Sequence, residues 1–275
     1  MIVVTGATGN TGRPLVQALA AAGAEVRAVS RTVGAADVPA GVEHRQADLL
    51  RADELSSALH GADTVFLLTS GEFLGAGGGL GDLLATARGA GTRRVVLLSS
   101  LGVGTGHHPA DLEKAIESSG IEWTILRPGN FASNAFQWAE SIRTERTMAA
   151  PFADIALPVI DPDDIAAVAA AVLLEDSHSG KTYNLTGPEA ITPRQQAAAI
   201  ALAVGEPVQF VELSRARARA RMLQFMPEPV VESTLAILGT PAPALQQVSP
   251  DIEQILGRPA HTFTDWAARN SAAFT

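Results

Sequence analysis

Three glycines near the N-terminus have the spacing of a loop that folds around phosphate groups. The stretch IVVTGATGNTG, residues 2–12, places Gly6, Gly9 and Gly12 three residues apart, directly after an apolar run. In such a loop Gly6 allows a sharp exit from a strand, Gly9 lets the backbone approach a pyrophosphate, and Gly12 lets the next helix pack closely. We therefore expect a dinucleotide to bind here, with an ordinary strand-to-helix turn as the alternative.

The residues that follow the expected second strand indicate which dinucleotide binds. A site for NAD usually has an acidic residue at this point, which binds the ribose hydroxyls. Here the sequence reads Ser30, Arg31 and Thr32. A guanidinium can bind phosphate through two parallel hydrogen bonds, so Ser30 and Arg31 predict NADP(H), bound through its 2′-phosphate. The alternative is a solvated arginine at the end of a strand.

Short apolar runs alternate with amphipathic stretches through the first half of the chain. This alternation predicts a Rossmann-type α/β fold, in which a doubly wound parallel sheet has helices on both faces and binds ligands at the carboxyl ends of its strands. We expect residues 1–150 to form this dinucleotide-binding domain. Residues 151–275 should form mainly a smaller, mostly helical substrate-binding lobe, with some segments returning to the Rossmann core. The expected strands lie within residues 1–6, 25–31, 42–49, 63–70, 95–102 and 122–129.

Composition limits the partners of the chain. Its 275 residues are 47% hydrophobic, which is enough for a sizeable core, and the net charge of −9 argues against binding nucleic acid or an anionic membrane. The chain has no cysteine, which excludes disulfides and thiolate sites, and we expect no metal. It shows neither a membrane-spanning apolar run nor a signal peptide. We therefore expect a cytoplasmic protein, monomeric or homodimeric, that acts on a small aromatic molecule.

Several segments resemble the NmrA-like group of atypical short-chain dehydrogenases/reductases. This group includes NADPH-dependent quinone reductases, ketoreductases of aromatic polyketide pathways and redox-sensing regulators. The similarity spans essentially the whole chain and is specific for the group but not for a substrate. It is carried by VTGATGNTG, AVSR, ADL at 47–49, VVLLSSLG, SGIEWTILRPGNF at 119–131, YNLTGPEAIT at 183–192 and LGRPAHTFTDWAARN near the end.

The resemblance also implies contacts with the cofactor. Thr8, Asn10 and Thr11 would line the phosphates, and Asp48 and Leu49 would lie by the adenine. Residues along the rest of the cofactor would be Leu68, Thr69 and Ser70, followed near the nicotinamide by Pro128, Gly129, Asn130 and Phe131.

The chain departs from typical short-chain reductases at the proton donor. Those enzymes carry a tyrosine and a lysine four residues apart after the serine-bearing strand, and the tyrosine protonates the new alkoxide. Here the only tyrosine is Tyr183, and Lys114 has Ala110 four positions before it.

Four residues near that strand are candidate catalytic groups. Ser99 and Ser100 lie where they could donate a hydrogen bond to a carbonyl oxygen, or they could cap a turn. His107 and His108 could donate a proton, or they could form an exposed loop before a proline. The charged pair Glu113 and Lys114, a few residues further on, should form a solvated helix face.

The second half of the chain offers weaker signals. Arg215, Arg217, Arg219 and Arg221 alternate with small residues, which predicts a solvated helix paired with acids such as Glu212, or else a clamp for an anionic substrate. The glycine-rich residues 71–81 could form a mobile lid or an undemanding loop. Four large apolar residues could line a pocket or pack in the core, namely Trp138, Met222, Phe225 and Met226.

Three functions are compatible with these features. We favour an NADPH-dependent reductase that transfers hydride to a quinone or conjugated aromatic ketone, because the anion formed from such an acceptor is delocalised and needs no strong protein acid. A non-enzymatic, NADP-binding redox sensor of the NmrA type is the alternative suggested by the missing tyrosine and lysine. An isomerase or dehydratase with a tightly held nucleotide is the third.

Overall fold

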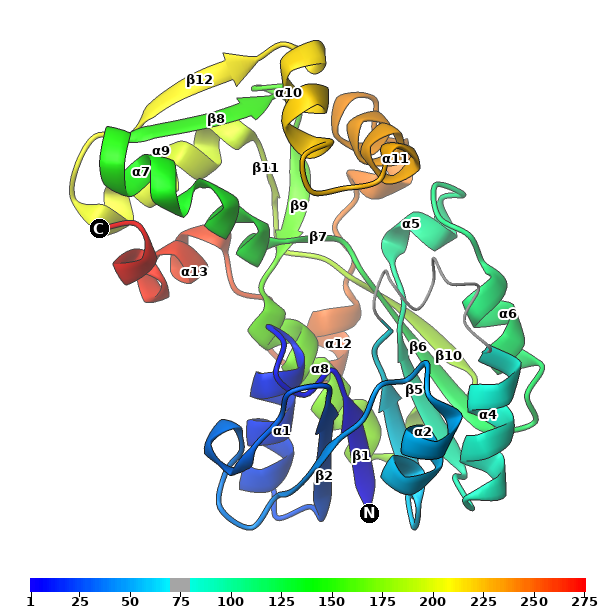
Figure 1. Cartoon of the computed structure of the whole chain (residues 1–275). Coiled ribbons are helices and arrows are strands. Elements are labelled where there is room, and N and C mark those ends of the chain that lie inside the picture. Colours follow the sequence, from blue (N-terminus) through cyan, green and yellow to red (C-terminus); the bar gives the residue numbers. More distant parts are fainter. Residues whose placement is uncertain (70–79) are drawn as a thin grey trace. The chain divides into compact units, whose positions relative to one another are not determined.

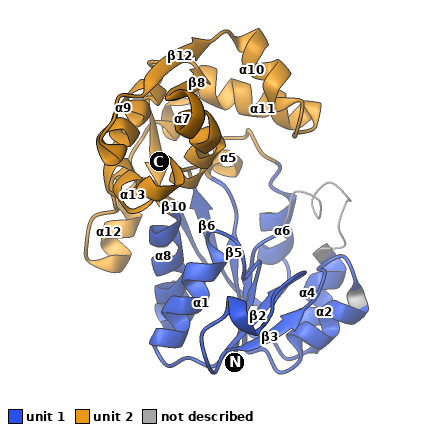
Figure 2. Ribbon diagram, turned by 60° about the vertical axis from the view of Figure 1, so that its left-hand side comes forward, with its two compact units in different colours: residues 1–100, 109–128, 162–184 blue, residues 101–108, 129–161, 185–275 orange. Residues whose placement is uncertain are grey.

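The computed structural model describes residues 1–69 and 80–275, which divide into two compact units. Unit 1 consists of residues 1–100, 109–128 and 162–184, and unit 2 of residues 101–108, 129–161 and 185–275 (Figure 2). The expected boundary at residue 150 differs from this division, since residues 129–161 belong to unit 2 and the next 23 return to unit 1. Within the described residues, no helix combines the length and apolar character needed to cross a bilayer.

Unit 1 is built on a seven-stranded sheet with the order β10-β6-β5-β4-β1-β2-β3. The pairs that run from β6 to β3 are all parallel, and the strand order reverses between β1 and β4, where a doubly wound sheet binds its ligand. The expected Rossmann-type fold is therefore confirmed. The strands are β1 (Ile2–Thr5), β2 (Val26–Ser30), β3 (Glu43–Gln46), β4 (Thr64–Leu67), β5 (Arg94–Leu98), β6 (Glu122–Pro128) and β10 (Lys181–Leu185).

Helices cover both faces of this sheet (Figure 1). Because side chains alternate along a strand, neighbouring residues of the buried strands serve opposite faces. Val3, Val65 and Val95 pack in the core under α2, α4 and α6, and their neighbours Val4 and Phe66 are fully buried on the other side. The helices are α1 (Gly12–Ala21) and α8 (Pro162–Leu174) on one face, and α2 (Ala52–Leu59), α4 (Leu80–Gly89) and α6 (Asp111–Glu117) on the other.

A buried arginine in β2 fixes the position of α2. Arg27 is only 5% exposed, and its guanidinium donates hydrogen bonds to the carbonyl oxygens of Ala58 and His60 at the end of α2, at 2.8 and 2.7 Å. It also pairs with Glu43 of β3 at 2.9 Å, and this hydrogen bond holds the pKa of Glu43 below its usual value. A cation at a helix C-terminus satisfies carbonyls that have no partner in the helix. Arg27 thus ties β2, β3 and α2 together.

Unit 2 contains two small sheets surrounded by helices. β9 (Leu157–Ile160) is the middle strand of the order β11-β9-β7, and β8 (Thr147–Pro151) pairs in parallel with β12 (Gln209–Leu213). The remaining elements are β7 (Asn130–Phe131), β11 (Ala190–Ile191), α5 (Leu101–Gly104), α7 (Ala139–Glu145), α9 (Pro193–Val204), α10 (Arg215–Met222), α11 (Glu228–Gly239), α12 (Asp251–Leu256) and α13 (Phe263–Arg269).

Most of the large apolar residues proposed as pocket lining pack in the core of unit 2. Trp138 lies against a cluster that contains Trp266, and its indole N–H donates to the carbonyl oxygen of Ala149 at 3.1 Å. Met222 and Met226 pack against the buried residues of α10 and α11. Phe225 differs from these three because it is 66% exposed.

The arginine-rich segment forms the exposed helix α10, in agreement with the solvated alternative. Arg215 and Arg219 pair with Glu232 of α11, at 3.0 and 2.6 Å, and Arg219 also contacts Glu228. Glu212, the acidic partner expected from the sequence, instead accepts a hydrogen bond from the backbone N–H of Ala153 at 3.1 Å. The arginines of one helix edge therefore join α10 to α11.

Candidate functional site

The glycine loop between β1 and α1 closes tightly on itself. Gly6 has φ of +64°, in the left-handed region, and its carbonyl oxygen accepts a hydrogen bond from the N–H of Gly9 at 3.0 Å. A Cβ at position 12 would lie 2.1 Å from the same oxygen, so only glycine fits there. Gly9 is exposed, and a Cβ on it would meet only the Gly6 oxygen, at 3.3 Å. This open backbone above a closed turn fits a bound pyrophosphate.

The polar residues of the loop differ in accessibility. The hydroxyl of Thr8 is 3.0 Å from that of Ser30, so the loop is joined to the end of β2. Asn10 is exposed, whereas Thr11 is fully buried at the start of α1. A contact from Thr11 to a ligand would therefore come from its backbone.

A pocket of about 420 Å³ lies beyond the ends of β2 and β3. It is lined by Arg31, which the sequence predicts to bind a cofactor phosphate, and by Asp48, which the resemblance places by the adenine. Leu49 packs against the core under the sheet. The other lining residues, which sequence reasoning missed, are Gln46, Ala47, Arg51 and Glu54.

Hydrogen bonds keep the acidic residues of this pocket in place. Asp48 accepts from the N–H of Leu50 at 3.0 Å, and its own N–H donates to Glu54 at 2.9 Å. Gln46 donates to the carbonyl oxygen of Val33 at 3.2 Å. The pocket walls are therefore fixed by bonds within unit 1.

The end of β4 is joined to β1 next to the glycine loop. The Thr5 hydroxyl lies 3.1 Å from the carbonyl oxygens of both Phe66 and Leu68, to either of which it can donate, and it accepts from the N–H of Leu68 at 2.8 Å. The Leu68 side chain lies 3.0 Å from the position that a Cβ on Gly6 would take. Thr69 is half-buried, while Ser70 and most of the proposed lid at residues 71–81 lie outside the described residues.

A buried carboxylate accepts a hydrogen bond from the serine that follows β5. The hydroxyl of Ser99 donates to Glu113 of α6 at 2.5 Å, and Arg127 of β6 donates to both oxygens of the same carboxylate, at 2.9 and 2.5 Å. Glu113 is 3% exposed, so its expected place on a solvated helix face is wrong. Its neighbour Lys114 is exposed, and Ser100 is half-buried.

Glu113 stays ionised because two donors offset its burial. Burial alone would raise the pKa of this carboxyl, but the hydrogen bonds from Arg127 and Ser99 hold the pKa below its usual value. A hydroxyl has a single proton. While Ser99 donates it to Glu113, Ser99 has only lone pairs to offer a ligand.

The two candidate histidines belong to unit 2. The N–H groups of His107 and His108 donate to the carbonyl oxygen of Gly102, at 2.8 and 3.0 Å. The ring of His107 has a hydrogen bond of 3.0 Å with the hydroxyl of Thr105. The backbone carbonyl oxygen of His107 accepts a hydrogen bond from the hydroxyl of Ser233 in α11 at 3.3 Å. Although His108 is partly exposed, its ring lies against Gly102, and the resulting loss of hydration, together with the nearby His107, lowers its pKa. The histidines therefore lie in an ordered turn.

The four residues expected near the nicotinamide are divided between the units. Pro128 ends β6 in unit 1 and is buried. Gly129 begins the next segment of unit 2, where its N–H donates to the carbonyl oxygen of Leu185 at 2.8 Å. Asn130 and Phe131 form β7.

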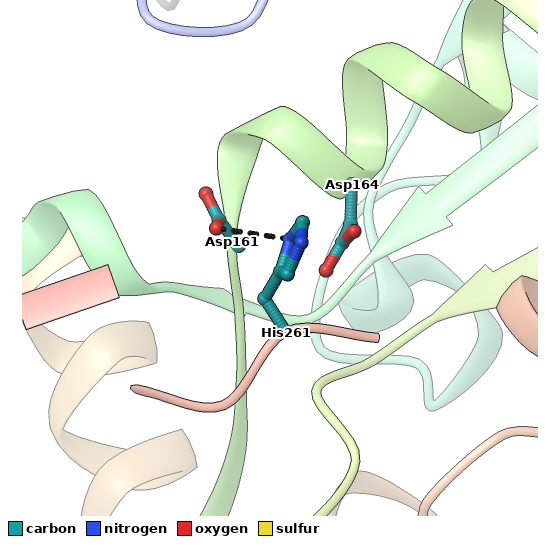
Figure 3. A group of neighbouring side chains, drawn as sticks. All are labelled: Asp161, Asp164 and His261. Carbon is teal, nitrogen blue, oxygen red and sulfur yellow. Dashed lines mark ion pairs between the residues drawn. The ribbon is translucent and has the colours of Figure 1, made fainter. Parts of the chain in front are cut away.

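Asp161, which follows β9, contacts a histidine and an arginine of unit 2. Its carboxylate pairs with His261 at 3.4 Å (Figure 3) and also contacts Arg269 of α13. Asp164, drawn in the same view, belongs to α8 of unit 1. Because a guanidinium already lies against Asp161, a divalent cation would have to displace it. The ion pairs of Asp161 instead fasten the segment around α13 to the end of β9.

These features define a Rossmann-type protein with a dinucleotide site. A family model described as NAD(P)H-binding matches residues 6–176, and the chain belongs to this family. A reductase of Streptomyces griseus, named for (4-alkanoyl-5-oxo-2,5-dihydrofuran-3-yl)methyl phosphate, is 36% identical over 100% of this chain and 99% of its own. The NAD(P)H azoreductase of Xenophilus azovorans is 30% identical over 100% of this chain and 99% of its own.

A solved structure extends the same comparison. The NADPH-dependent quinone oxidoreductase of Escherichia coli, in complex with NADPH, has a TM-score of 0.81 at 27% identity, and the match covers 98% of this chain and 99% of that one. The resemblance to NmrA-like reductases is thus confirmed, and the chain is an NAD(P)H-dependent oxidoreductase.

We expect Glu113→Gln to lower the free energy of unfolding at neutral pH by about 2–3 kcal/mol, because Arg127 then lacks its buried anion. The folded pKa of Glu113 lies below the value of 4.5 that it has without neighbours. The stabilisation by the carboxylate is therefore complete above about pH 4.5 and is lost as the pH falls through the folded pKa. The difference between native protein and variant should shrink in the same range, as measured by urea denaturation.

Glu117→Gln is the matched control, since Glu117 is exposed on the same helix. It should change stability by no more than about 0.5 kcal/mol. Equal losses in the two variants, or a Glu113→Gln loss that does not change with pH, would contradict the network.

Proposed function

We propose that this oxidoreductase uses NADPH to transfer a hydride to a quinone or a related conjugated acceptor, without a tyrosine–lysine pair. The observation that carries the proposal is the pocket beyond β2 and β3, which has Arg31 at the position where an NAD site has an acid. The closed glycine loop with its open backbone at Gly9 supports it.

The preference for NADPH follows from the chemistry of the pocket. Arg31 directly follows β2, so its guanidinium would bind the 2′-phosphate of the adenosine ribose. Thr8 and Ser30, whose hydroxyls lie 3.0 Å apart, join this end of β2 to the loop that would bind the pyrophosphate. NADPH, when bound, supplies the hydride.

The choice of acceptor follows from the hydrogen bonds that occupy two possible proton donors among the described residues. The hydroxyl of Tyr183, the single tyrosine, is hydrogen-bonded to His178 at 2.7 Å, and the hydroxyl of Ser99 donates a hydrogen bond to the carboxylate of Glu113. A quinone or conjugated carbonyl needs no such donor, because the charge left by hydride addition is delocalised. The relatives are named as reductases of an unsaturated furanone phosphate, an azo compound and a quinone. Conjugated acceptors agree with these names.

Turnover of the purified protein with NADPH tests this proposal. The acceptors are a benzoquinone, an azo dye, a conjugated aromatic ketone and a 4-alkanoyl-2,5-dihydrofuranone, with cyclohexanone as the isolated ketone. We expect oxidation of NADPH with at least one conjugated acceptor and none with cyclohexanone, whose alkoxide requires a proton donor.

Stoichiometric binding of NADPH without oxidation by any acceptor would overturn the enzyme proposal. If binding of a regulatory protein then depended on the redox state of the cofactor, the alternative of a sensor would be favoured. Efficient reduction of cyclohexanone would contradict the proposal that the reaction proceeds without a strong protein acid.

The two histidines test where the proton comes from. We expect His107→Ala and His108→Ala each to lower kcat by no more than about tenfold, or 1.4 kcal/mol, because a delocalised anion can take its proton from water. Loss of hydration, together with the nearby His107, lowers the pKa of His108 and so disfavours its protonated form. A general acid contributes about 10²- to 10⁴-fold. A loss of that size, with removal of the basic limb of the pH profile, would instead identify the histidine as the donor.

A further inference from the structure

We propose that Arg51 is a second specificity-determining residue for the cofactor, which binds the 2′-phosphate together with Arg31. This inference rests on the proposed use of NADPH. It starts from the pocket beyond β2 and β3, which two guanidinium groups line from different elements. Arg31 follows β2, and Arg51 immediately precedes α2.

The sheet register explains why these two residues share one pocket. β2 and β3 are parallel neighbours, and Ser30 at the end of β2 pairs with Gln46 at the end of β3. The chain leaves both strands at the same edge of the sheet. After five residues it reaches Arg51, and the N–H of Arg51 donates to the carbonyl oxygen of Asp48 at 3.0 Å. This turn brings a second cation to the edge where Arg31 lies.

Glu54 holds Arg51 in place without using its whole guanidinium. The Nε of Arg51 lies 2.7 Å from Oε1 of Glu54, and the other carboxylate oxygen accepts the N–H of Asp48 at 2.9 Å. The next carboxylate, Asp53, is 3.9 Å from a terminal nitrogen of Arg51. The two terminal nitrogens of the Arg51 guanidinium therefore do not bond Glu54. This edge of the guanidinium can bind a phosphate through two hydrogen bonds.

The acids of the pocket already have other roles. Asp48 accepts from the N–H of Leu50, and Glu54 bonds both Arg51 and the N–H of Asp48. Committed in this way, the carboxylates shape the turn, and the two arginines are the cations that the pocket presents. Two guanidinium groups match a phosphate monoester on a ribose better than an uncharged diol, for which an NAD site supplies a carboxylate after the second strand, where this chain has Arg31.

The test compares three single substitutions by isothermal calorimetry: Arg31→Gln, Arg51→Gln and Arg45→Gln. Arg45→Gln is the matched control because it removes the same charge from a residue outside the pocket. Arg45 lies on β3 and bonds Ser57 and Glu43. The probes are NADPH, NADH, 2′,5′-ADP and 5′-AMP. The two adenosine phosphates isolate the 2′-phosphate from the rest of the cofactor.

We expect Arg51→Gln to weaken NADPH and 2′,5′-ADP by about tenfold or more, the usual effect of losing a hydrogen bond between charged groups. The affinities for NADH and 5′-AMP should stay within about twofold, and Arg45→Gln should change none of the four beyond that range. Circular dichroism and the urea midpoint of each variant report whether it is folded.

Two results would overturn the assignment of Arg51. Arg51→Gln could weaken NADH as much as NADPH, which would make it a contact for the shared adenosine, or it could leave all four affinities unchanged. If Arg31→Gln then still removed the preference for NADPH, only the role of Arg51 would fail. Equal affinities of the unmodified protein for NADPH and NADH would instead overturn the proposed cofactor preference itself.

Discussion

The close approach of Gly12 to the carbonyl oxygen of Gly6 is the constraint on which the site depends. With only 2.1 Å between that oxygen and the position of a Cβ, no side chain fits at residue 12, so α1 begins directly against the turn that leaves β1. The left-handed φ of Gly6 directs the chain into this turn. The result is a short loop with exposed backbone at Gly9, at the edge where the parallel strands of unit 1 end.

Two arginine–carboxylate pairs, each with one buried member, hold the elements around this edge. Arg27 pairs with Glu43 and binds the last turn of α2, the helix whose other end carries Arg51. Arg127 pairs with Glu113 and so joins β6 to α6. The same carboxylate accepts a hydrogen bond from the hydroxyl of Ser99. Removing one member of such a pair leaves buried polar groups without partners, which costs more than the loss of a surface pair. Both pairs position elements of the fold, and the second also sets the hydrogen-bonding role of a candidate catalytic serine.

The sequence predicts the Rossmann-type sheet well because its signals are local. Apolar runs, glycine turns and helix starts each depend on a few consecutive residues, and Gly6 and Gly12 occupy the conformations that their spacing indicates. Arg31 was recognisable because it replaces an acid at a fixed place after a strand. Arg51 follows the third strand, but its distance from Arg31 in the chain gives no sign that both residues line one pocket.

Long-range contacts account for what the sequence did not predict. Glu113 reads as a solvated residue on a short helix, and only the fold brings it to Arg127 and Ser99, each 14 residues away. Glu232 lies 17 residues from Arg215, so the nearer Glu212 seemed the natural partner by sequence alone. The expected boundary at residue 150 differs from the observed division for a similar reason, because the chain crosses between the two units several times.

A single-turnover measurement with stereospecifically deuterated NADPH tests the central claim, that the bound nucleotide takes part in chemistry. The enzyme with either 4R- or 4S-deuterated NADPH is mixed anaerobically with a reducible quinone, and loss of the reduced nicotinamide absorbance is followed. The account predicts oxidation in one turnover, slowed by deuterium in only one of the two forms, because a fixed cofactor transfers hydride from one face. Bound NADPH that stays reduced, or that reacts equally fast in both deuterated forms and in the unlabelled one, would contradict it.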